Sequence, residues 1–321
     1  MKTITLQEHD LIQDARSEGL TSLPSRVIEK DLLLTEVLGI VAKSANEIIQ
    51  PVFCGGTCLS KAHGLIERMS EDIDFKLVAP TDLSRTARSK TLSAFKTHLA
   101  TEFRNAGFDV PAEQIKARDE NSYILMNLHY ESRFAPVVSL RPEIMVELNA
   151  RPPVLPTRNL PIQPMLSQLT QRPGPSVDIR CISVEETLAE KVLSFLRRTA
   201  EVRAGRNRAA YDDRLVRHIY DVYAIVDKHE ALDLPHEHFA VLVAGDADQY
   251  RNQYPEFKTD PGGQMREVLA ALSDQPALFE NDYLNFVDEL VFGKPVGFNQ
   301  ACAVFINVAE QMISRFESGQ A

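Results

Sequence analysis

The stretch that most constrains the fold begins at residue 51 and reads PVFCGGTCLSKAHGLIERMSEDIDFKLV. Its first residues, PVFC, are typical of a short strand, and the Gly55-Gly56 pair that follows predicts a turn. TCLSKAHGL predicts a helix that starts at this turn, and RMSEDIDFKLV predicts a second strand. A strand, a glycine turn, a helix and a strand in close succession favour an α/β fold in this part of the chain.

Two aspartates lie in the second predicted strand. Side chains two positions apart in a strand point to the same face, so Asp72 and Asp74 project together, and Ser70 falls on that face too. Ile73 and Phe75 can then enter the core. Two neighbouring carboxylates repel each other unless a cation lies between them. Mg²⁺ prefers oxygen ligands and takes others from phosphates and water, so the pair predicts a site for Mg²⁺ (or Mn²⁺).

The glycine turn suits a phosphate group. Glycine lets the backbone approach a ligand closely, and a helix start offers free N–H groups beside the Thr57 hydroxyl. Neither the Lys-Ser/Thr of a Walker A loop nor the third glycine of a dinucleotide-binding fingerprint follows at the required spacing. Lys61 and Arg68 flank the turn and helix and are placed to approach phosphates, although Lys61 is equally compatible with a surface position.

Periodicity extends this pattern over the chain. Helices are expected over about 5–18, 24–48 and 81–107, and strands at NSYILMNLHY and EIMVELNA. The proline-rich stretch over about 151–175 predicts a domain boundary. After it, one strand is expected at VDIRCI, and helices over about 183–200, 209–229, 235–245, 264–273, 279–291 and 298–317.

The elements predict two domains. Residues 1–170 are expected to form an α/β (α+β) domain with a small mixed sheet and N-terminal helices, and residues 171–321 a mainly α-helical domain. With 321 residues, 44% of them hydrophobic, the chain has enough apolar material for two cores.

Charge and hydropathy limit the partners. With a net charge of -10, the protein is not expected to coat nucleic acid with its whole surface, so any such contact must be local. Acidic and polar residues interrupt the N-terminal MKTITLQEHDLIQDARSEGL, which excludes a secretory signal, and the apolar DLLLTEVLGIVAKSA is too short to span a bilayer. We therefore expect a cytoplasmic protein without membrane contact. Its four cysteines form no CxxC pair and are expected to be reduced.

Four motifs resemble those of a known family, in the same order. GGT followed by DID, with a third carboxylate on a later strand, resembles the minimal nucleotidyltransferase domain of the polymerase β superfamily. GGTCLSKAHGLIERMSEDIDF is similar to the GGTxLxK…RxSxDIDF signature of the AbiEii/AbiGii toxins of bacterial abortive-infection and type IV toxin–antitoxin systems. SVEETLAEKVLSFLRR resembles the helix that carries the family's functional lysine, and RHIYDVYAI resembles its Arg-x-x-x-Asp motif.

The resemblance implies a set of site residues. The third carboxylate would be Glu147, the functional lysine Lys191, and the last motif maps to Arg217 and Asp221. The residues implied in catalysis are Asp72, Asp74, Lys191 and Asp221. Those implied in nucleotide binding are Gly55, Gly56, Thr57, Lys61, Arg68, Ser70, Lys191 and Arg217, and the implied metal ligands are Asp72, Asp74 and Glu147.

The residues alone leave simpler interpretations open. Glu147 is compatible with a glutamate at the edge of a strand, and Lys191 with an ion pair to a glutamate of its own helix. Arg217 and Asp221 have the spacing of a helical salt bridge, while Asp221 is also suited to orient Lys191 or to assist an acceptor hydroxyl. The seven arginines within 197–217 suit either a phosphate-binding patch for RNA or a solvated segment balanced by acidic neighbours.

Residues and resemblance together predict a toxin-type nucleotidyltransferase. It would transfer a nucleoside monophosphate from a nucleoside triphosphate (NTP) to an RNA acceptor, with tRNA as the first candidate, and so block growth or translation. A cognate antitoxin is expected to be encoded nearby. The alternatives are transfer to a small molecule or a protein side chain, and a non-catalytic nucleotide-binding module.

Overall fold

The computed structural model of the chain describes residues 1–137, 140–172, 174–206, 212–229 and 236–319. The fold is α/β with a seven-stranded mixed sheet and many helices, which confirms the fold class expected from the sequence. The chain forms two compact units, which are described separately below. Unit 1 contains Met1–Gly64 and Ser70–Ile182, and unit 2 contains Leu65–Met69 and Ser183–Ala321.

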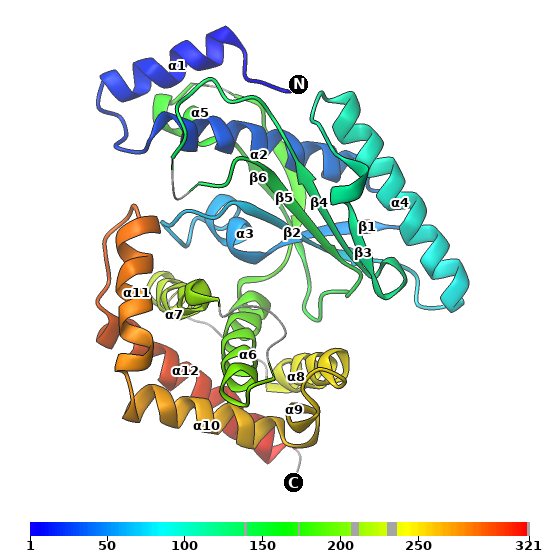
Figure 1. Ribbon diagram of the computed structural model, residues 1–321, viewed down its shortest axis with the longest axis vertical. Coiled ribbons are helices and arrows are strands. Elements are labelled where there is room, and N and C mark those ends of the chain that lie inside the picture. The colour runs from blue at the N-terminus through cyan, green and yellow to red at the C-terminus, as the bar shows by residue number, and fades with distance from the viewer. Residues whose placement is uncertain (138–139, 173, 207–211, 230–235, 320–321) are drawn as a thin grey trace. The chain divides into compact units, whose positions relative to one another are not determined.

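Unit 1 contains the sheet and its covering helices (Figure 1). Two of its helices begin at side chains that accept a free N–H group of the first turn: Thr5 caps α1, and Ser84 caps α4. The helices are α1 (Leu6–Ser17), α2 (Ser25–Lys43), α3 (Gly55–Lys61), α4 (Arg85–Asn105) and α5 (Met165–Thr170). The strands are β1 (Gln50–Cys54), β2 (Asp72–Val78), β3 (Lys116–Arg118), β4 (Tyr123–Leu128), β5 (Ile144–Asn149), β6 (Arg158–Ile162) and β7 (Val177–Cys181).

The strand order is β3-β4-β5-β2-β1-β7-β6. Strand β2 lies near the centre, antiparallel to β1 and parallel to β5, and β1 is parallel to β7. Strand β4 is antiparallel to β3 and to β5. This order places β2 between β1 and β5: Asp74 pairs with Cys54 of β1 and with Glu147 of β5, and Asp72 pairs with Met145 of β5.

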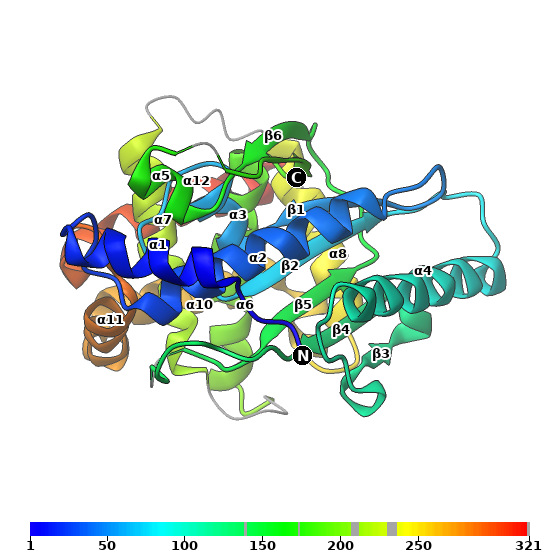
Figure 2. The same cartoon turned by 90° about the horizontal axis from the view of Figure 1, so that it is seen from above.

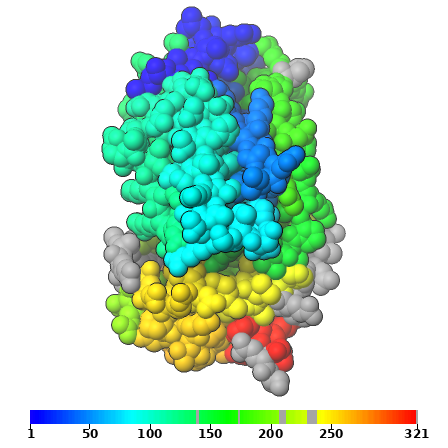
Figure 3. All heavy atoms as spheres, turned by 90° about the vertical axis from the view of Figure 1, so that its right-hand side faces the viewer, coloured from blue at the N-terminus to red at the C-terminus, as the bar shows by residue number. Residues whose placement is uncertain are grey.

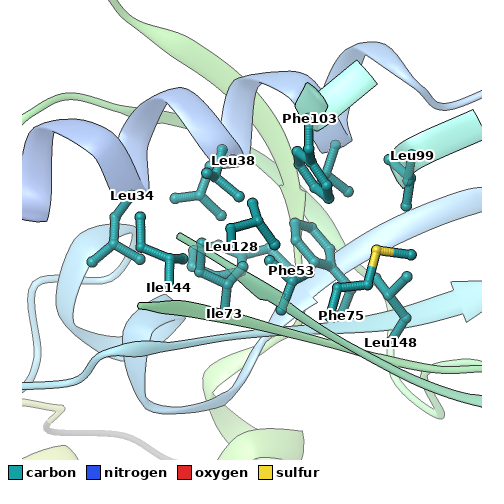
Figure 4. Close-up of a cluster of buried hydrophobic side chains, with 14 of the residues drawn as sticks. Leu34, Leu38, Phe53, Ile73, Phe75, Leu99, Phe103, Leu128, Ile144 and Leu148 are labelled. Atoms are coloured by element: carbon teal, nitrogen blue, oxygen red, sulfur yellow. The ribbon is translucent and has the colours of Figure 1, made fainter. Parts of the chain in front are cut away.

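One face of the sheet forms the core of unit 1. Strands β4 and β5 alternate strictly between buried and half-buried residues, and β2 begins with the same alternation. Helices α2 and α4 lie on one side of the sheet in Figures 1 and 2, and the outer side of α4 is exposed in Figure 3. Because a shift by one residue would turn the apolar side chains outward, this packing fixes the strand register. Figure 4 labels the residues of this core: Leu34, Leu38, Phe53, Ile73, Phe75, Leu99, Phe103, Leu128, Ile144 and Leu148.

Unit 2 is helical in its described residues. Ser183 caps its first helix by accepting a hydrogen bond from the backbone of Glu186 at 3.1 Å. Residues 65–69, which lie between α3 and β2 in the sequence, join this unit because Met69 N donates to Leu290 O at 2.8 Å. The helices are α6 (Val184–Arg203), α7 (Arg217–Lys228), α8 (His236–Tyr250), α9 (Pro255–Thr259), α10 (Pro261–Asp274), α11 (Ala277–Leu290) and α12 (Phe298–Ser318).

Most predicted elements are confirmed, and the differences have local reasons. The proline-rich stretch contains β6 and α5, and β7 pairs with β1 and β6, so the sheet continues past the expected boundary at 170/171 to Ile182. Strand β3 and helix α9 are too short for their periodicity to indicate them. The helix expected over 209–229 is α7, preceded by a 3-10 turn at Asp213–Val216, while residues 209–211 lie outside the described part.

The structure also shows where the cysteines lie and whether any described helix could span a membrane. All four cysteines are buried, and none of them forms a disulfide. Within the described ranges, no helix has the length and apolar character needed to cross a bilayer.

Candidate active site

Three carboxylates meet on neighbouring strands. In the parallel pairing of β2 with β5, Asp72 is opposite Met145 and Asp74 is opposite Glu147. Residues that pair in register point to the same face, so Glu147 projects beside the two aspartates. The opposite face is the apolar core, which is why these charged residues remain half-buried. The expected common face of Asp72 and Asp74 is therefore present, and Glu147 shares it.

Gly55 makes room for one of these carboxylates. Its φ of +75° is a left-handed conformation that favours glycine, and a Cβ atom at this position would overlap the Asp74 carboxylate. The first glycine of the motif thus allows β1, α3 and the Asp74 side chain to approach one another. A side chain at residue 55 would displace the carboxylate.

The hydroxyls of the motif connect α3 to the start of β2. Thr57 Oγ1 lies 2.9 Å from Ser70 Oγ and also contacts the carbonyl oxygen of Asp72. Thr57 is buried, so these contacts are protected from water. Strand β2 begins only at Asp72, so Ser70 lies just before the strand and faces Thr57. The Thr57 hydroxyl thus holds the backbone at the first aspartate, and the Ser70 hydroxyl contacts Thr57.

The neighbouring strand β4 supplies a partner for Glu147. The Tyr123 hydroxyl donates a hydrogen bond of 3.1 Å to Glu147 Oε2. Burial and the nearby Glu147 raise the pKa of Tyr123 far above its ordinary value, so the phenol stays protonated and acts as a donor. Glu147 is therefore oriented from its own sheet.

Asp72 and Lys61 both have ion-pair partners. Arg141 Nη1 lies 2.7 Å from Asp72 Oδ1. Lys61 forms an ion pair with Asp31 of α2, and this carboxylate also accepts a hydrogen bond from Met165 N at 2.6 Å. Lys61 thus ties α3 to α2 and α5 within unit 1. Arg141 was not among the residues that the sequence motifs indicated.

A second charged cluster lies in unit 2. Arg68 donates two hydrogen bonds to Asp221, from Nε to Oδ1 at 2.6 Å and from Nη2 to Oδ2 at 2.7 Å. Lys191 Nζ lies 2.9 Å from Asp221 Oδ2. All three side chains are buried. Asp221 therefore orients Lys191, which is one of the roles that the sequence left open, and Arg68 holds Asp221 in place.

The buried charges shift one another's pKa values. Burial alone would raise the pKa of Asp221, but Arg68 and Lys191 outweigh it and hold this pKa well below its usual range. Burial lowers the pKa of Lys191 and Asp221 opposes this shift. Burial together with Lys191 and Arg217 lowers the pKa of His218 well below its ordinary value, so this histidine is neutral at physiological pH. Two cations against one carboxylate leave the Arg68–Lys191–Asp221 cluster with a net positive charge.

Arg217 is not paired with Asp221 in a helical salt bridge. Its Nη1 lies 3.3 Å from Asp212 Oδ2 and 2.9 Å from the carbonyl oxygen of Arg214. Other arginines of the segment 197–217 also contact carboxylates. These contacts favour a segment whose charge is balanced by acidic neighbours over a phosphate-binding patch for RNA. Arg208 lies outside the described residues. The pairs are Arg197–Glu201, Arg197–Asp246, Arg198–Asp212, Arg206–Glu256 and Arg214–Glu289.

The oxygen donors fit a small divalent cation. Mg²⁺ binds proteins through one or two carboxylates and takes its remaining ligands from water and phosphates. Asp72 and Asp74 offer such a pair, and the side chain of Asp72 is 37% exposed. In the part of the chain that the structure describes, no three His, Cys, Asp or Glu residues are arranged to hold a metal. Carboxylates of the protein together with phosphate oxygens of a nucleotide would complete such a coordination shell.

Comparison with known proteins agrees with the motifs. The profile of the nucleotidyl transferase AbiEii toxins of type IV toxin–antitoxin systems matches residues 42–304. Among solved structures, the chain is similar to MenT4, a nucleotidyltransferase toxin from Mycobacterium tuberculosis H37Rv, with a TM-score of 0.42 and 18% identity over 74% of this chain and 78% of that one. No curated protein sequence matches. Because the profile match covers more than half of its length, the chain belongs to the AbiEii family of nucleotidyltransferase toxins.

Proposed function

We propose that the protein transfers a nucleoside monophosphate from an NTP to a hydroxyl of an RNA acceptor, with tRNA as the first acceptor to test. The observation that carries this proposal is the β2–β5 register, which places Asp72, Asp74 and Glu147 on one face. Gly55 allows the Asp74 carboxylate to lie against the turn. Modification of the acceptor RNA would block growth or translation.

Asp72 and Asp74 are proposed to hold Mg²⁺ (or Mn²⁺). When bound, the cation would neutralise phosphate charge as the bond to pyrophosphate breaks. The chain's own residues prepare this site: Thr57 fixes the backbone of Asp72, and Tyr123 orients Glu147. The backbone of Gly55 and Gly56 is proposed to lie against phosphate oxygens.

Lys191 is proposed to bind the triphosphate. Asp221 orients its ammonium group, and the net positive charge of the cluster with Arg68 favours an anion. In the reaction, the acceptor oxygen forms a new bond to the α-phosphorus, the bond from the α-phosphorus to the pyrophosphate oxygen breaks, and the proton of the acceptor hydroxyl passes to solvent water. Asp221 is buried between two cations, which favours a positioning role for it over that of a base.

An RNA acceptor is supported by the edge of the sheet. In the register of β3 with β4, Arg118 is opposite Tyr123 and Lys116 is opposite Leu125, so both cations share the face that carries the carboxylates. Both are exposed. Lysine on an edge strand also prevents sheet-to-sheet association, so this observation supports an anionic acceptor without naming it. Transfer to a small molecule or a protein side chain is the alternative.

One further partner follows from the family. A type IV toxin implies an antitoxin. The antitoxin would act either by binding the toxin or by opposing the effect of the toxin's product. The proposed substrates, an NTP and RNA, place the reaction in the cytoplasm.

The experiment is to incubate the purified protein with total RNA and each NTP in turn, radiolabelled at the α-phosphate. Labelled RNA that depends on a divalent cation would support the proposal, and Asp74→Ala is the control. Label in protein or small molecules instead would favour the alternative acceptors. Without any transfer under these conditions, the enzyme assignment would give way to a nucleotide-binding module.

A further inference from the structure

We propose that Arg141 is a phosphate-binding residue of the nucleotide site, and that its guanidinium exchanges between Asp72 in the free protein and the triphosphate in the nucleotide complex. The inference rests on the proposed function, since it requires a nucleotide and a cation at Asp72. It names a residue that lies outside the sequence motifs. Its evidence is an anchored backbone with an exposed, charged side chain.

The backbone of Arg141 is held by two buried charges. Its N–H donates to Glu71 Oε2 at 2.7 Å, and its carbonyl oxygen accepts from Lys30 Nζ at 2.9 Å. Lys30 and Glu71 are themselves an ion pair at 2.6 Å, with side-chain exposures of 0% and 9%. A buried ion pair with further hydrogen bonds is costly to separate, because removing either partner leaves a charge without compensation. The Cα of Arg141 is therefore fixed beside the residue that precedes Asp72.

The side chain of Arg141 is exposed, in contrast to the buried charges that hold its backbone. It is 45% exposed, and its contact with Asp72 joins it to a side chain that is 37% exposed. Its other contact is with the sulfur of Met145, at 3.8 Å. Ion pairs at such exposure are weak and are easily replaced by stronger partners. The guanidinium is thus free to move while its backbone stays in place.

A bound cation would force this exchange. A divalent ion on Asp72 would compete with the guanidinium for the carboxylate and would repel the guanidinium. Phosphate oxygens would then be available to the displaced group, because Mg²⁺ shares its coordination shell with the phosphates of its nucleotide. A guanidinium pairs with phosphate through its fixed fork of donors, which an ammonium group cannot reproduce.

A simpler role would be that of a counter-ion. Arg141 would then only relieve the repulsion between Asp72 and Asp74 and would have no contact with nucleotide. Both roles predict that Arg141→Gln binds a cation more tightly in the absence of nucleotide, because a competitor is removed. Only the phosphate-binding role predicts weaker binding of the nucleotide.

The test uses the full-length protein and two binding measurements. The affinity for Mn²⁺ alone is measured by electron paramagnetic resonance, and that for a non-hydrolysable NTP analogue at saturating Mn²⁺ by calorimetry, with the NTP chosen from the labelling experiment. For Arg141→Gln we expect Mn²⁺ to bind several-fold more tightly and the analogue about tenfold more weakly, the loss expected for a charge-assisted hydrogen bond. Arg141→Lys should restore only part of the nucleotide affinity.

Arg85→Gln is the matched control, since Arg85 is also an exposed arginine paired with a carboxylate, that of Glu120. It should change neither affinity. Unchanged analogue affinity in Arg141→Gln, in a protein whose parent binds NTP and transfers label, would overturn the inference and leave the proposed function intact. A parent protein that binds no NTP would overturn both.

Discussion

Arg68 and Asp221 are joined by two hydrogen bonds although they lie 153 positions apart in the sequence. Arg68 belongs to the short segment between the glycine motif and the DID strand, and Asp221 to the last family motif. The pair therefore links two motifs through a buried contact, and the second oxygen of the same carboxylate contacts Lys191. An arginine expected to bind phosphate thus contributes by fixing the carboxylate that orients the lysine.

The first prediction concerns this carboxylate. Asp221→Asn leaves Arg68 and Lys191 as buried cations without their partner, so we expect a loss of about 3–5 kcal/mol in the free energy of unfolding. Lys191→Met keeps the Arg68–Asp221 pair, so it should cost less stability while abolishing transfer and weakening NTP binding. Urea unfolding and transfer assays on both variants check this. Equal destabilisation by the two changes would contradict the role of Arg68 as the main partner of Asp221.

The depressed pKa of Asp221 predicts how the stability depends on pH. The folded-state pKa lies below the unfolded value of about 3.9, so the contribution of this carboxylate is complete above pH 3.9 and is lost as the pH falls toward the folded value. Urea unfolding between pH 7 and pH 3 should therefore show a shallower acid loss in Asp221→Asn than in the parent. Parallel curves would show that the folded-state pKa is not depressed.

The next prediction distinguishes two reasons for a glycine at position 55: the space that the Asp74 carboxylate needs and the positive φ angle of the backbone. Gly55→Ala places a methyl group where the Asp74 carboxylate lies, in a backbone conformation that costs a non-glycine residue about 1–2 kcal/mol. Gly64 has a similar φ of +65° with no heavy atom within 4 Å of an added Cβ, so Gly64→Ala is the matched control. Both variants should lose stability, but only Gly55→Ala should lose transfer. Normal transfer in Gly55→Ala would remove the link between this glycine and Asp74.

For the two aspartates that are proposed to hold the metal, we predict loss of activity without loss of fold. Asp74→Ala should abolish transfer, and its melting temperature should hold or rise, because one of two neighbouring carboxylates is removed. Circular dichroism melts with and without Mg²⁺ check this: Mg²⁺ with NTP should stabilise the parent and not the variant. An unfolded Asp74→Ala protein, together with a parent indifferent to metal, would mean that the pair is structural.

The sequence could predict the parts of this site that depend on local pattern. Strand alternation places Asp72 and Asp74 on one face, and the apolar run of β5 predicts a strand around Glu147. Partners that come from distant segments could not be predicted in this way. The spacing of Arg217 and Asp221 fits a helical salt bridge, yet in the structure Asp221 pairs with Arg68 and Lys191 instead.

One signal for the missing partners was present in the sequence. Glu29, Lys30 and Asp31 are three consecutive charges in helix α2, and all are buried. Each is compensated by a different segment: Glu29 accepts from Arg133 N at 2.8 Å, Lys30 pairs with Glu71, and Asp31 pairs with Lys61. Buried charges of this kind require partners, but periodicity does not say which ones.

The last prediction tests the acceptor. If RNA lies along the edge of the sheet, changing Lys116 and Arg118 together to Gln should weaken RNA binding and flatten its dependence on salt, because each lost phosphate contact reduces the slope by about one unit. Arg203 and Arg206 are the matched control: both are exposed, and Arg206 already pairs with Glu256. Their double change to Gln should alter RNA binding little, and NTP affinity should be unchanged in both double variants. The measurement is the transfer rate against acceptor concentration at two salt levels. If the change of Arg203 and Arg206 lowers the transfer rate more, the acceptor contacts the arginine-rich segment instead of β3. If neither double change alters the transfer rate at either salt level, a small uncharged acceptor becomes the better candidate.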